Sequence, residues 1–356
     1  MAVRRSVCWR RVTLLLASLV VCSFFAEITL RVVSPVRSFV NPMKSFHRAD
    51  PEIGWLGLPD LDARFRQIDF DVRVRNGPDG FRLREGSVMP KSGSPVIAVV
   101  GDSFTWGYGV PGGHQFTDVL QARLGPGLSV RNLGINSFST VQEWMLLRRE
   151  LSNGLAPRMA LLMAFNNDYS DNIDDDATRP RVLPGGSNTT PVLLPASKPV
   201  VHPWSRLLKQ SYLFSAVAYA FDLRKIRRHA ARLAESTFDE GQVSEPAIRA
   251  MRWTLGQFKD TCRSNGVMMA CAYVPSFEDV RADREGGARS VTRDLCAGLG
   301  IPFLDLTPGL RNRGGDSPER LYFEHDLHWS VEGNAAAGEE LAVFVRGLLS
   351  SPDTPR

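Results

Sequence analysis

From residue 96 onward, short apolar runs alternate with longer stretches of helical periodicity, and this alternation constrains the fold more than any other feature of the chain. The first run, VIAVV at residues 96–100, is apolar and β-branched and stops at Gly101, which is typical of a buried parallel strand. Further strand-like runs lie at residues 128–133, 159–165, 267–274 and 302–306. Helical patterns lie at residues 115–124, 141–151, 247–264, 290–299 and 331–349. The alternation predicts an α/β fold, a three-layer α/β/α arrangement with a parallel sheet in the middle.

A basic N-terminus followed by an apolar stretch predicts a membrane anchor. Four arginines precede the apolar run at residues 12–26, namely Arg4, Arg5, Arg10 and Arg11. That run is shorter than the roughly 20 residues that span a bilayer, but apolar residues up to Val33 extend it when Glu27 and Arg31 lie at the interface. The arginines favour a cytoplasmic N-terminus, so we expect a single-pass protein of the inner membrane with its bulk on the periplasmic side. A cleaved signal peptide and a buried core helix are the alternatives.

The domain boundaries follow from these patterns. Residues 1–11 form the cytoplasmic basic segment, and residues 12–33 are expected to cross the lipid bilayer. Residues 34–92 are a connector with a small β element, because QIDFDVRVR at residues 67–75 alternates like a half-exposed strand. Residues 93–350 form the main domain, with a helical insertion at about 170–245. A helical pattern at residues 204–235 is rich in Arg and Lys, which favours either contact with an anionic surface or a solvated basic face.

Composition excludes several classes of function. The net charge of +5 is spread along 356 residues, so we do not expect nucleic-acid binding. The five cysteines lack metal-ligand spacing, and the three downstream ones are expected to be buried free thiols. The acidic residues Asp171 and 174–176 form either a calcium site or a solvated loop, and we favour the loop. No metal or cofactor is predicted.

Four polar clusters fall where predicted strands end or where the last predicted helix begins. They are GDSFTWGYG at residues 101–109, NLGINSFSTVQ at 132–142, FNNDYSDN at 165–172 and EHDLHWS at 324–330. In an open parallel sheet, ligands bind outside the carboxyl ends of the strands. The clusters are therefore expected to converge on one site.

The residue types in these clusters suit acyl transfer. A serine hydroxyl such as that of Ser103 needs a base to take its proton, and His328 is a suitable one because its pKa lies near neutrality. Asp326 can fix the tautomer of that histidine. The backbone N–H of Ser103, a backbone N–H near Ser137 and the side-chain amide of Asn167 can stabilise a developing oxyanion.

The four clusters resemble the conserved blocks of the SGNH (GDSL) hydrolase superfamily, in the same order, from residue 96 to the last helix. The resemblance implies Ser103 as nucleophile, His328 as base and Asn167 as an oxyanion-hole residue. Asp326 matches the acid of the D-x-H-W form found in polysaccharide O-acetylation members of the superfamily. The GW and GFR motifs at residues 54–55 and 80–82 are similar to bacterial members with an N-terminal membrane anchor.

Three positions depart from the usual pattern of the superfamily. Its second-block glycine aligns with Ser137, with Gly134 as the alternative match; its third-block glycine aligns with Phe165; and its usual aspartate aligns with His325. Two further residues are expected to support the site: Asp102, and Asp168 through a hydrogen bond that orders the Asn167 loop. Trp106 and Tyr108 either line an acyl or sugar pocket or pack beneath the loop.

The sequence predicts a serine esterase that works through an acyl-serine intermediate. The expected substrate is an O-acylated carbohydrate, with acetyl as the acyl group, or a small ester. One alternative is a polysaccharide O-acetyltransferase with the same residues, supplied by a membrane acyl-donor protein. Another is a non-catalytic polysaccharide-binding or assembly protein. Thr105 stands where a G-x-S-x-G motif needs its second glycine, which argues against an ordinary α/β-hydrolase.

Overall fold

The computed structural model describes residues 2–33, 37–39, 45–186, 189–198, 210–233, 243–282 and 287–350. Its centre is a five-stranded sheet in the order β12-β11-β8-β6-β7, and every neighbouring pair in it is parallel. The strands are β6 (Val96–Gly101), β7 (Ser129–Asn132), β8 (Pro157–Ala164), β11 (Met268–Tyr273) and β12 (Phe303–Asp305). All five predicted strands are present, and the predicted α/β class is confirmed.

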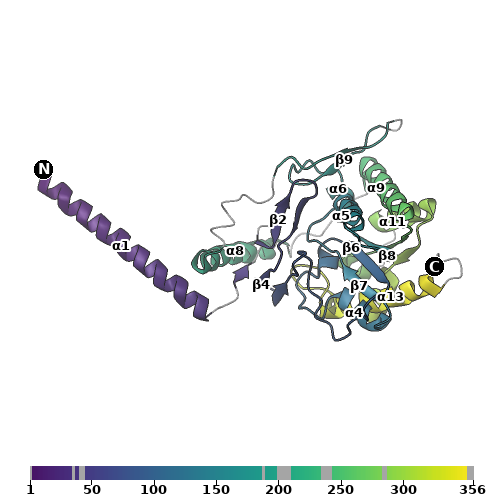
Figure 1. The fold of residues 1–356 in the computed structure, drawn as a ribbon, viewed down its shortest axis with the longest axis horizontal. Coiled ribbons are helices and arrows are strands. Elements are labelled where there is room, and N and C mark those ends of the chain that lie inside the picture. The colour runs from purple at the N-terminus through teal and green to yellow at the C-terminus, as the bar shows by residue number, and fades with distance from the viewer. Residues whose placement is uncertain are drawn as a thin grey trace.

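Helices cover both faces of this sheet (Figure 1). One face packs against α5 (Thr140–Ser152), α9 (Glu245–Ser264) and α11 (Gly287–Leu299), and the other against α4 (Phe116–Leu124), α12 (Thr307–Gly314) and α13 (Val331–Ser350). In β6, Ala98 and Val100 enter the first core, and Ile97 and Val99 enter the second. This explains why the strand reads as continuously apolar, since it is buried on both sides.

The order of the strands creates a switch point at β6. The chain runs from β6 to β7 on one side and then returns to β8 on the other side of β6. Loops that leave the carboxyl ends of such strands diverge and leave a crevice between them. The residues that follow β6 are therefore in the position where a parallel sheet binds ligands.

The N-terminal segment forms two small sheets. The first is β1 (Ser38–Phe39), β4 (Asp62–Arg66) and β5 (Asp71–Arg75), and the second is the hairpin of β2 (His47–Asp50) and β3 (Gly54–Gly57). The predicted strand at residues 67–75 is shorter than expected, because the Gln67 N–H donates to the Phe70 carbonyl and closes a turn between β4 and β5. The first sheet shares a small core with Trp106 of the main domain, whereas Trp55 and Leu56 of the hairpin join a core of the main sheet.

Several short elements were not predicted from the sequence. They are α3 (Ser103–Trp106), α6 (Asn167–Asp171), α10 (Phe277–Ala282), α12, the 3-10 turn η1 (Pro318–Leu321) and a hairpin of β9 (Arg181–Leu183) and β10 (Val192–Leu194). The helix expected at residues 204–235 is α8 (Tyr212–Leu233), and residues 204–209 and 234–235 lie outside the described part of the chain. Short elements lack the repeated periodicity that sequence patterns need.

The N-terminal residues form one long helix, α1 (Ala2–Val33), which extends away from the body of the protein (Figure 1). Within it, Arg11–Val33 is 23 residues long with a mean hydropathy of 2.1, which is long and apolar enough to cross a membrane. A signal sequence would satisfy the same criteria. None of this stretch is buried against the described part of the protein, so the alternative of a buried core helix is wrong.

Candidate active site

Ser103 lies at the first turn after β6, where the chain reverses from strand to helix. Asp102 caps the four-residue helix α3, because its Oδ1 accepts a hydrogen bond of 2.9 Å from the Phe104 N–H. A Cβ at Gly101 would lie 2.1 Å from Thr105 Oγ1, so only glycine permits a turn this tight. Ser103 is thereby held at the edge of the sheet with 9% of its surface exposed.

His328 comes from the loop before α13 and lies 225 residues after Ser103 in the sequence. Its Nε2 lies 2.8 Å from Ser103 Oγ, and its Nδ1 is hydrogen-bonded to Asp326 Oδ1. Leu327, between the two, has a φ of 66°, and the Phe323 N–H donates to the His328 carbonyl at 2.8 Å. This compact loop turns two side chains that are only two residues apart toward one another. The structure thus brings together Ser103, His328 and Asp326.

Aromatic rings hold the imidazole on two sides. The Tyr108 ring stacks on His328 with centroids 4.2 Å apart and planes 16° apart, and the Phe104 ring lies 4.7 Å away. The Tyr108 hydroxyl accepts a hydrogen bond of 2.8 Å from Gln67 Nε2. Burial and the nearby Asp326 carboxylate raise the pKa of Tyr108 well above its usual value. Tyr108 therefore contacts the site, whereas Trp106 is fully buried in the small N-terminal core.

The backbone near the second cluster distinguishes Ser137 from Gly134. Ser137 adopts a φ of 61°, a conformation that favours glycine, and among the described residues its N–H donates to no protein atom. The Gly134 N–H already donates to Asn132 Oδ1 at 2.8 Å. A Cβ at Gly134 would lie 2.3 Å from the Trp106 nitrogen, so this glycine permits close packing against α3. Ser137 is the position with an available donor.

Asn167 and Asp168 begin helix α6, which lies beside α3 because Phe165 packs against Phe104 with centroids 4.8 Å apart. Asn167 Nδ2 donates to Asp171 at 3.2 Å, which leaves its second amide hydrogen for another acceptor. Asp168 Oδ2 accepts a hydrogen bond of 2.9 Å from the Phe165 N–H. Asp168 thereby orders the turn that carries Asn167.

A buried glutamate that we did not predict lies beneath this side of the site. Glu143, on α5, is fully buried, and neither of its carboxyl oxygens has a hydrogen-bond partner among the described residues. Burial, followed by the charge of Asp168, raises its pKa well above the usual value. Burial likewise raises the pKa of Asp168 well above its usual value and that of Asp102 to about 6. The sequence feature that could have indicated this buried carboxyl group is the position of Glu143 within the apolar pattern of residues 141–147.

His325, at the position of the usual aspartate, is hydrogen-bonded to Asp69, whereas the two ring nitrogens of His328 are hydrogen-bonded to Asp326 and Ser103. The Nδ1 of His325 lies 2.7 Å from Asp69 Oδ1, and the His325 N–H donates to Asp69 Oδ2 at 3.0 Å. The hydrogen bond to Asp69 is the main cause that raises the pKa of His325. His325 therefore ties the loop to the turn between β4 and β5.

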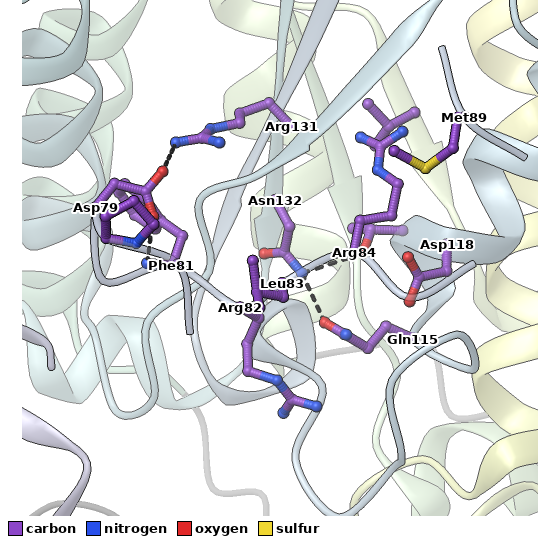
Figure 2. A pocket seen from close by; sticks show the side chains of 14 residues that line it. Asp79, Phe81, Arg82, Leu83, Arg84, Met89, Gln115, Asp118, Arg131 and Asn132 are labelled. Carbon is purple, nitrogen blue, oxygen red and sulfur yellow. Dashed lines mark hydrogen bonds and ion pairs between the residues drawn. The ribbon is translucent and has the colours of Figure 1, made fainter. Parts of the chain in front are cut away.

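A hollow of about 280 Å³ lies beside β7 and the start of α4, apart from the residues described above (Figure 2). Figure 2 shows Arg131 directed at Asp79, and Asn132 directed at Gln115, with which it forms a hydrogen bond of 3.1 Å. Neither Ser103 nor His328 lines this hollow.

Arg82, at the wall of that hollow, supports the loop that carries Tyr108. Its guanidinium is buried under the Trp106 ring, 5.0 Å from the centroid, and donates to the carbonyls of Gly107 and Val110 at 3.3 Å each. Burial lowers the pKa of Arg82 to about 10, which leaves it charged at neutral pH. An arginine of the N-terminal segment thus fixes a loop of the main domain.

In residues 2–350, apart from the gaps given above, no group of three or more His, Cys, Asp or Glu side chains is arranged to hold a metal ion. Asp171, one of the acidic residues considered for calcium, instead pairs with Arg179 at 3.0 Å.

Comparison with known proteins places these features in context. The model of the GDSL-like lipase/acylhydrolase family matches residues 99–336. No curated protein matches the chain.

Three solved structures are similar to this chain. The carbohydrate acetylesterase Est24 from Sinorhizobium meliloti is 14% identical, with a TM-score of 0.39, over 72% of this chain and 100% of that one. The esterase EstA from Pseudoalteromonas sp. is 11% identical, with a TM-score of 0.42, over the same shares. The aryl esterase from M. smegmatis is 15% identical, with a TM-score of 0.39, again over 72% and 100%.

Proposed function

This chain belongs to the GDSL-like lipase/acylhydrolase family and is an acyl-ester hydrolase, and from that premise we propose that Ser103 is its nucleophile, His328 its base and Asp326 the acid that orients the base. The supporting observation is the distance of 2.8 Å between Ser103 Oγ and His328 Nε2. A base must lie within hydrogen-bond reach of the proton that it removes.

The reaction proceeds in two half-reactions. Ser103 Oγ attacks the ester carbonyl while His328 Nε2 takes its proton, and His328 then gives that proton to the departing alcohol. The result is an acyl-serine. Water attacks the acyl carbon, His328 takes a proton from the water, and the acid leaves as the proton returns to Ser103. Asp326 holds Nδ1 of the imidazole protonated and stabilises the imidazolium in each half-reaction.

The oxyanion of each tetrahedral intermediate is stabilised by three donors. These are the backbone N–H groups of Ser103 and Ser137 and the side-chain amide of Asn167. The available N–H of Ser137 and its glycine-like backbone conformation support this assignment over Gly134. Asp102 and Asp168 support the site, because they cap α3 and order the turn at Asn167.

The proposed substrate is an O-acetylated carbohydrate on the periplasmic side of the inner membrane. Two features support it: four arginines precede an apolar helix long enough to span a membrane, and Asp326 and His328 form the D-x-H-W arrangement. An O-acetyltransferase is the second candidate, because the D-x-H-W arrangement is also that of the polysaccharide O-acetylation members. Its acyl-serine would react with a sugar hydroxyl instead of water, and a membrane acyl-donor protein would supply the acyl group.

The test uses the full chain in nanodiscs with 4-nitrophenyl acetate as substrate. Ser103→Ala should lower the rate at least about 1000-fold. Ser152→Ala, at an exposed site at the end of α5, is the matched control and should leave the rate unchanged. A fluorophosphonate should add to the Ser103 peptide, as seen by mass spectrometry. Activity that survives Ser103→Ala would overturn the assignment.

A second measurement separates the two candidate reactions. An acetylated oligosaccharide that loses acetate to water supports the hydrolase. Transfer of acetyl from 4-nitrophenyl acetate to an added oligosaccharide, detected by its mass, supports the transferase. Rates on 4-nitrophenyl acetate and octanoate report the acyl length, and a faster reaction with octanoate would contradict the acetyl assignment.

A further inference from the structure

The end of α1 is joined to the start of α8 by a side chain of α1. Glu27 Oε1 accepts a hydrogen bond of 3.0 Å from the Tyr212 N–H, and Oε2 accepts bonds of 2.9 Å from the Leu213 N–H and from Ser211 Oγ. The first N–H groups of a helix have no partners within it, and a carboxylate there is favourable because of the helix dipole. Glu27 therefore acts as the cap of a helix that begins 185 residues later.

Two arginines strengthen this junction. Arg31 donates to Glu27 at 2.9 Å and lies 5.4 Å from the centroid of the Tyr212 ring, and Arg37 lies 5.8 Å from the same ring. Both arginines come from the end of α1 or just after it. The junction thus fixes the start of α8 beside the end of the candidate membrane span (Figure 1).

The faces of α8 differ in what they contact. Ser215 is buried, and the Tyr219 ring lies 5.3 Å from the guanidinium of Arg66 in the small N-terminal sheet. Phe214, Val217 and Phe221 are 41%, 48% and 64% exposed. Their spacing of three and four residues puts them on one side of the helix. α8 therefore presents an apolar stripe, made of these three residues, away from the protein body.

The position of Glu27 along the candidate membrane span indicates what covers this stripe. Glu27 lies six residues before Val33, the last residue of the candidate span, which is about 9 Å along a helix. If α1 crosses a bilayer, the start of α8 lies near the boundary between headgroups and acyl chains, where interfacial helices bury their apolar faces. The sequence after the stripe, RKIRR at residues 224–228, adds positive charge that attracts anionic headgroups.

We propose that α8 is an interfacial helix whose apolar stripe, Phe214, Val217 and Phe221, inserts into the lipid leaflet on the side of the catalytic domain. This inference rests on the proposed membrane location of α1. The domain is then held at two points, the span and α8, which fixes its height and orientation above the membrane instead of leaving it on a free tether.

The test places an environment-sensitive NBD probe at single engineered cysteines in the full chain, reconstituted in phosphatidylcholine–phosphatidylglycerol nanodiscs. Cys8→Ser and Cys22→Ser remove the cysteines of α1, and Cys262, Cys271 and Cys296 are buried. The probe sites are Phe221→Cys in the stripe, Val343→Cys as an exposed control on α13, and Leu15→Cys within the span. Hydrolysis of 4-nitrophenyl acetate by each labelled protein checks that it is folded.

Lipids with a doxyl quencher near the headgroup should quench the probe at position 221 at least about twofold more than the probe at position 343. Equal quenching at these two positions, with strong quenching at position 15, would overturn the proposal and leave the membrane span intact. A blue-shifted but unquenched probe at position 221 would indicate a protein contact and would also overturn it. An unquenched probe at position 15 would overturn the membrane location itself, and the proposal with it.

Discussion

Two sides of Ser103 differ in how their polar groups are satisfied. Toward the C-terminal loop, the polar side chains are hydrogen-bonded to one another. Toward α5 and α6, one buried carboxyl group has no hydrogen-bond partner among the described residues. His328 has Asp326 on one ring nitrogen, Ser103 on the other and Tyr108 against its face. Glu143 has no hydrogen-bond partner among the described residues, and its pKa is raised well above the usual value. The first side is arranged to move a proton, and the second lies beneath the proposed oxyanion hole with carboxyl groups whose pKa values are raised.

The largest effect is expected when the proposed base, His328, is removed. His328→Ala should lower kcat roughly 10,000-fold, the upper end of what a general base contributes. Hydrolysis of 4-nitrophenyl acetate measures it. His325→Ala is the matched control, because this histidine pairs with Asp69 away from the site, and its effect should stay below about threefold. Similar losses in the two variants would mean that the loop, and not the imidazole, matters.

The opposite side is tested through Asn167. Asn167→Ala should lower kcat about 100-fold with little change in KM, because an oxyanion donor acts mainly in the transition state. We expect the lower end of the usual range, since one amide hydrogen is used by Asp171. Asn265→Ala, on the exposed end of α9, should leave kcat unchanged. A rise in KM without a loss in kcat would assign Asn167 to substrate binding instead.

The buried carboxyl group gives a prediction about stability. Because the folded pKa of Glu143 is raised, its contribution to stability is complete below the ordinary value of 4.5 and is lost as the pH rises toward the folded pKa. The free energy of unfolding should fall by up to about 1.4 kcal/mol per pH unit in that window. Glu143→Gln, which is neutral at every pH, should flatten this fall in urea titrations between pH 4.5 and 8. An unchanged slope would show that Glu143 does not titrate as described.

The smallest expected effect concerns the ring that stacks on the base. Tyr108→Phe keeps the stacking and loses the hydroxyl, which is hydrogen-bonded to Gln67 and Asp326, so kcat should change less than about threefold. Tyr108→Ala removes the ring and should cost about tenfold, because the imidazole is then less well positioned. If the two variants behave alike, the hydroxyl and not the ring is the important part of Tyr108.

The sequence by itself determined the architecture and the chemical groups. The five strands and the long helices follow from periodicity, which is a local property of the chain. Ser103, His328 and Asp326 could be proposed from the sequence because few residue types perform acyl transfer and because the clusters that carry them resemble those of the SGNH superfamily.

Only the tertiary structure decided which donor is available and which groups are buried together. The sequence aligned the second-block position with Ser137 and left Gly134 as an alternative, and a hydrogen bond from the Gly134 N–H to Asn132 distinguishes them. Glu143 lacks a hydrogen-bond partner among the described residues, and Glu27 caps α8; both features depend on residues that are distant in sequence. Burial and hydrogen-bond partners arise from such non-local contacts, and no periodicity along the chain encodes them.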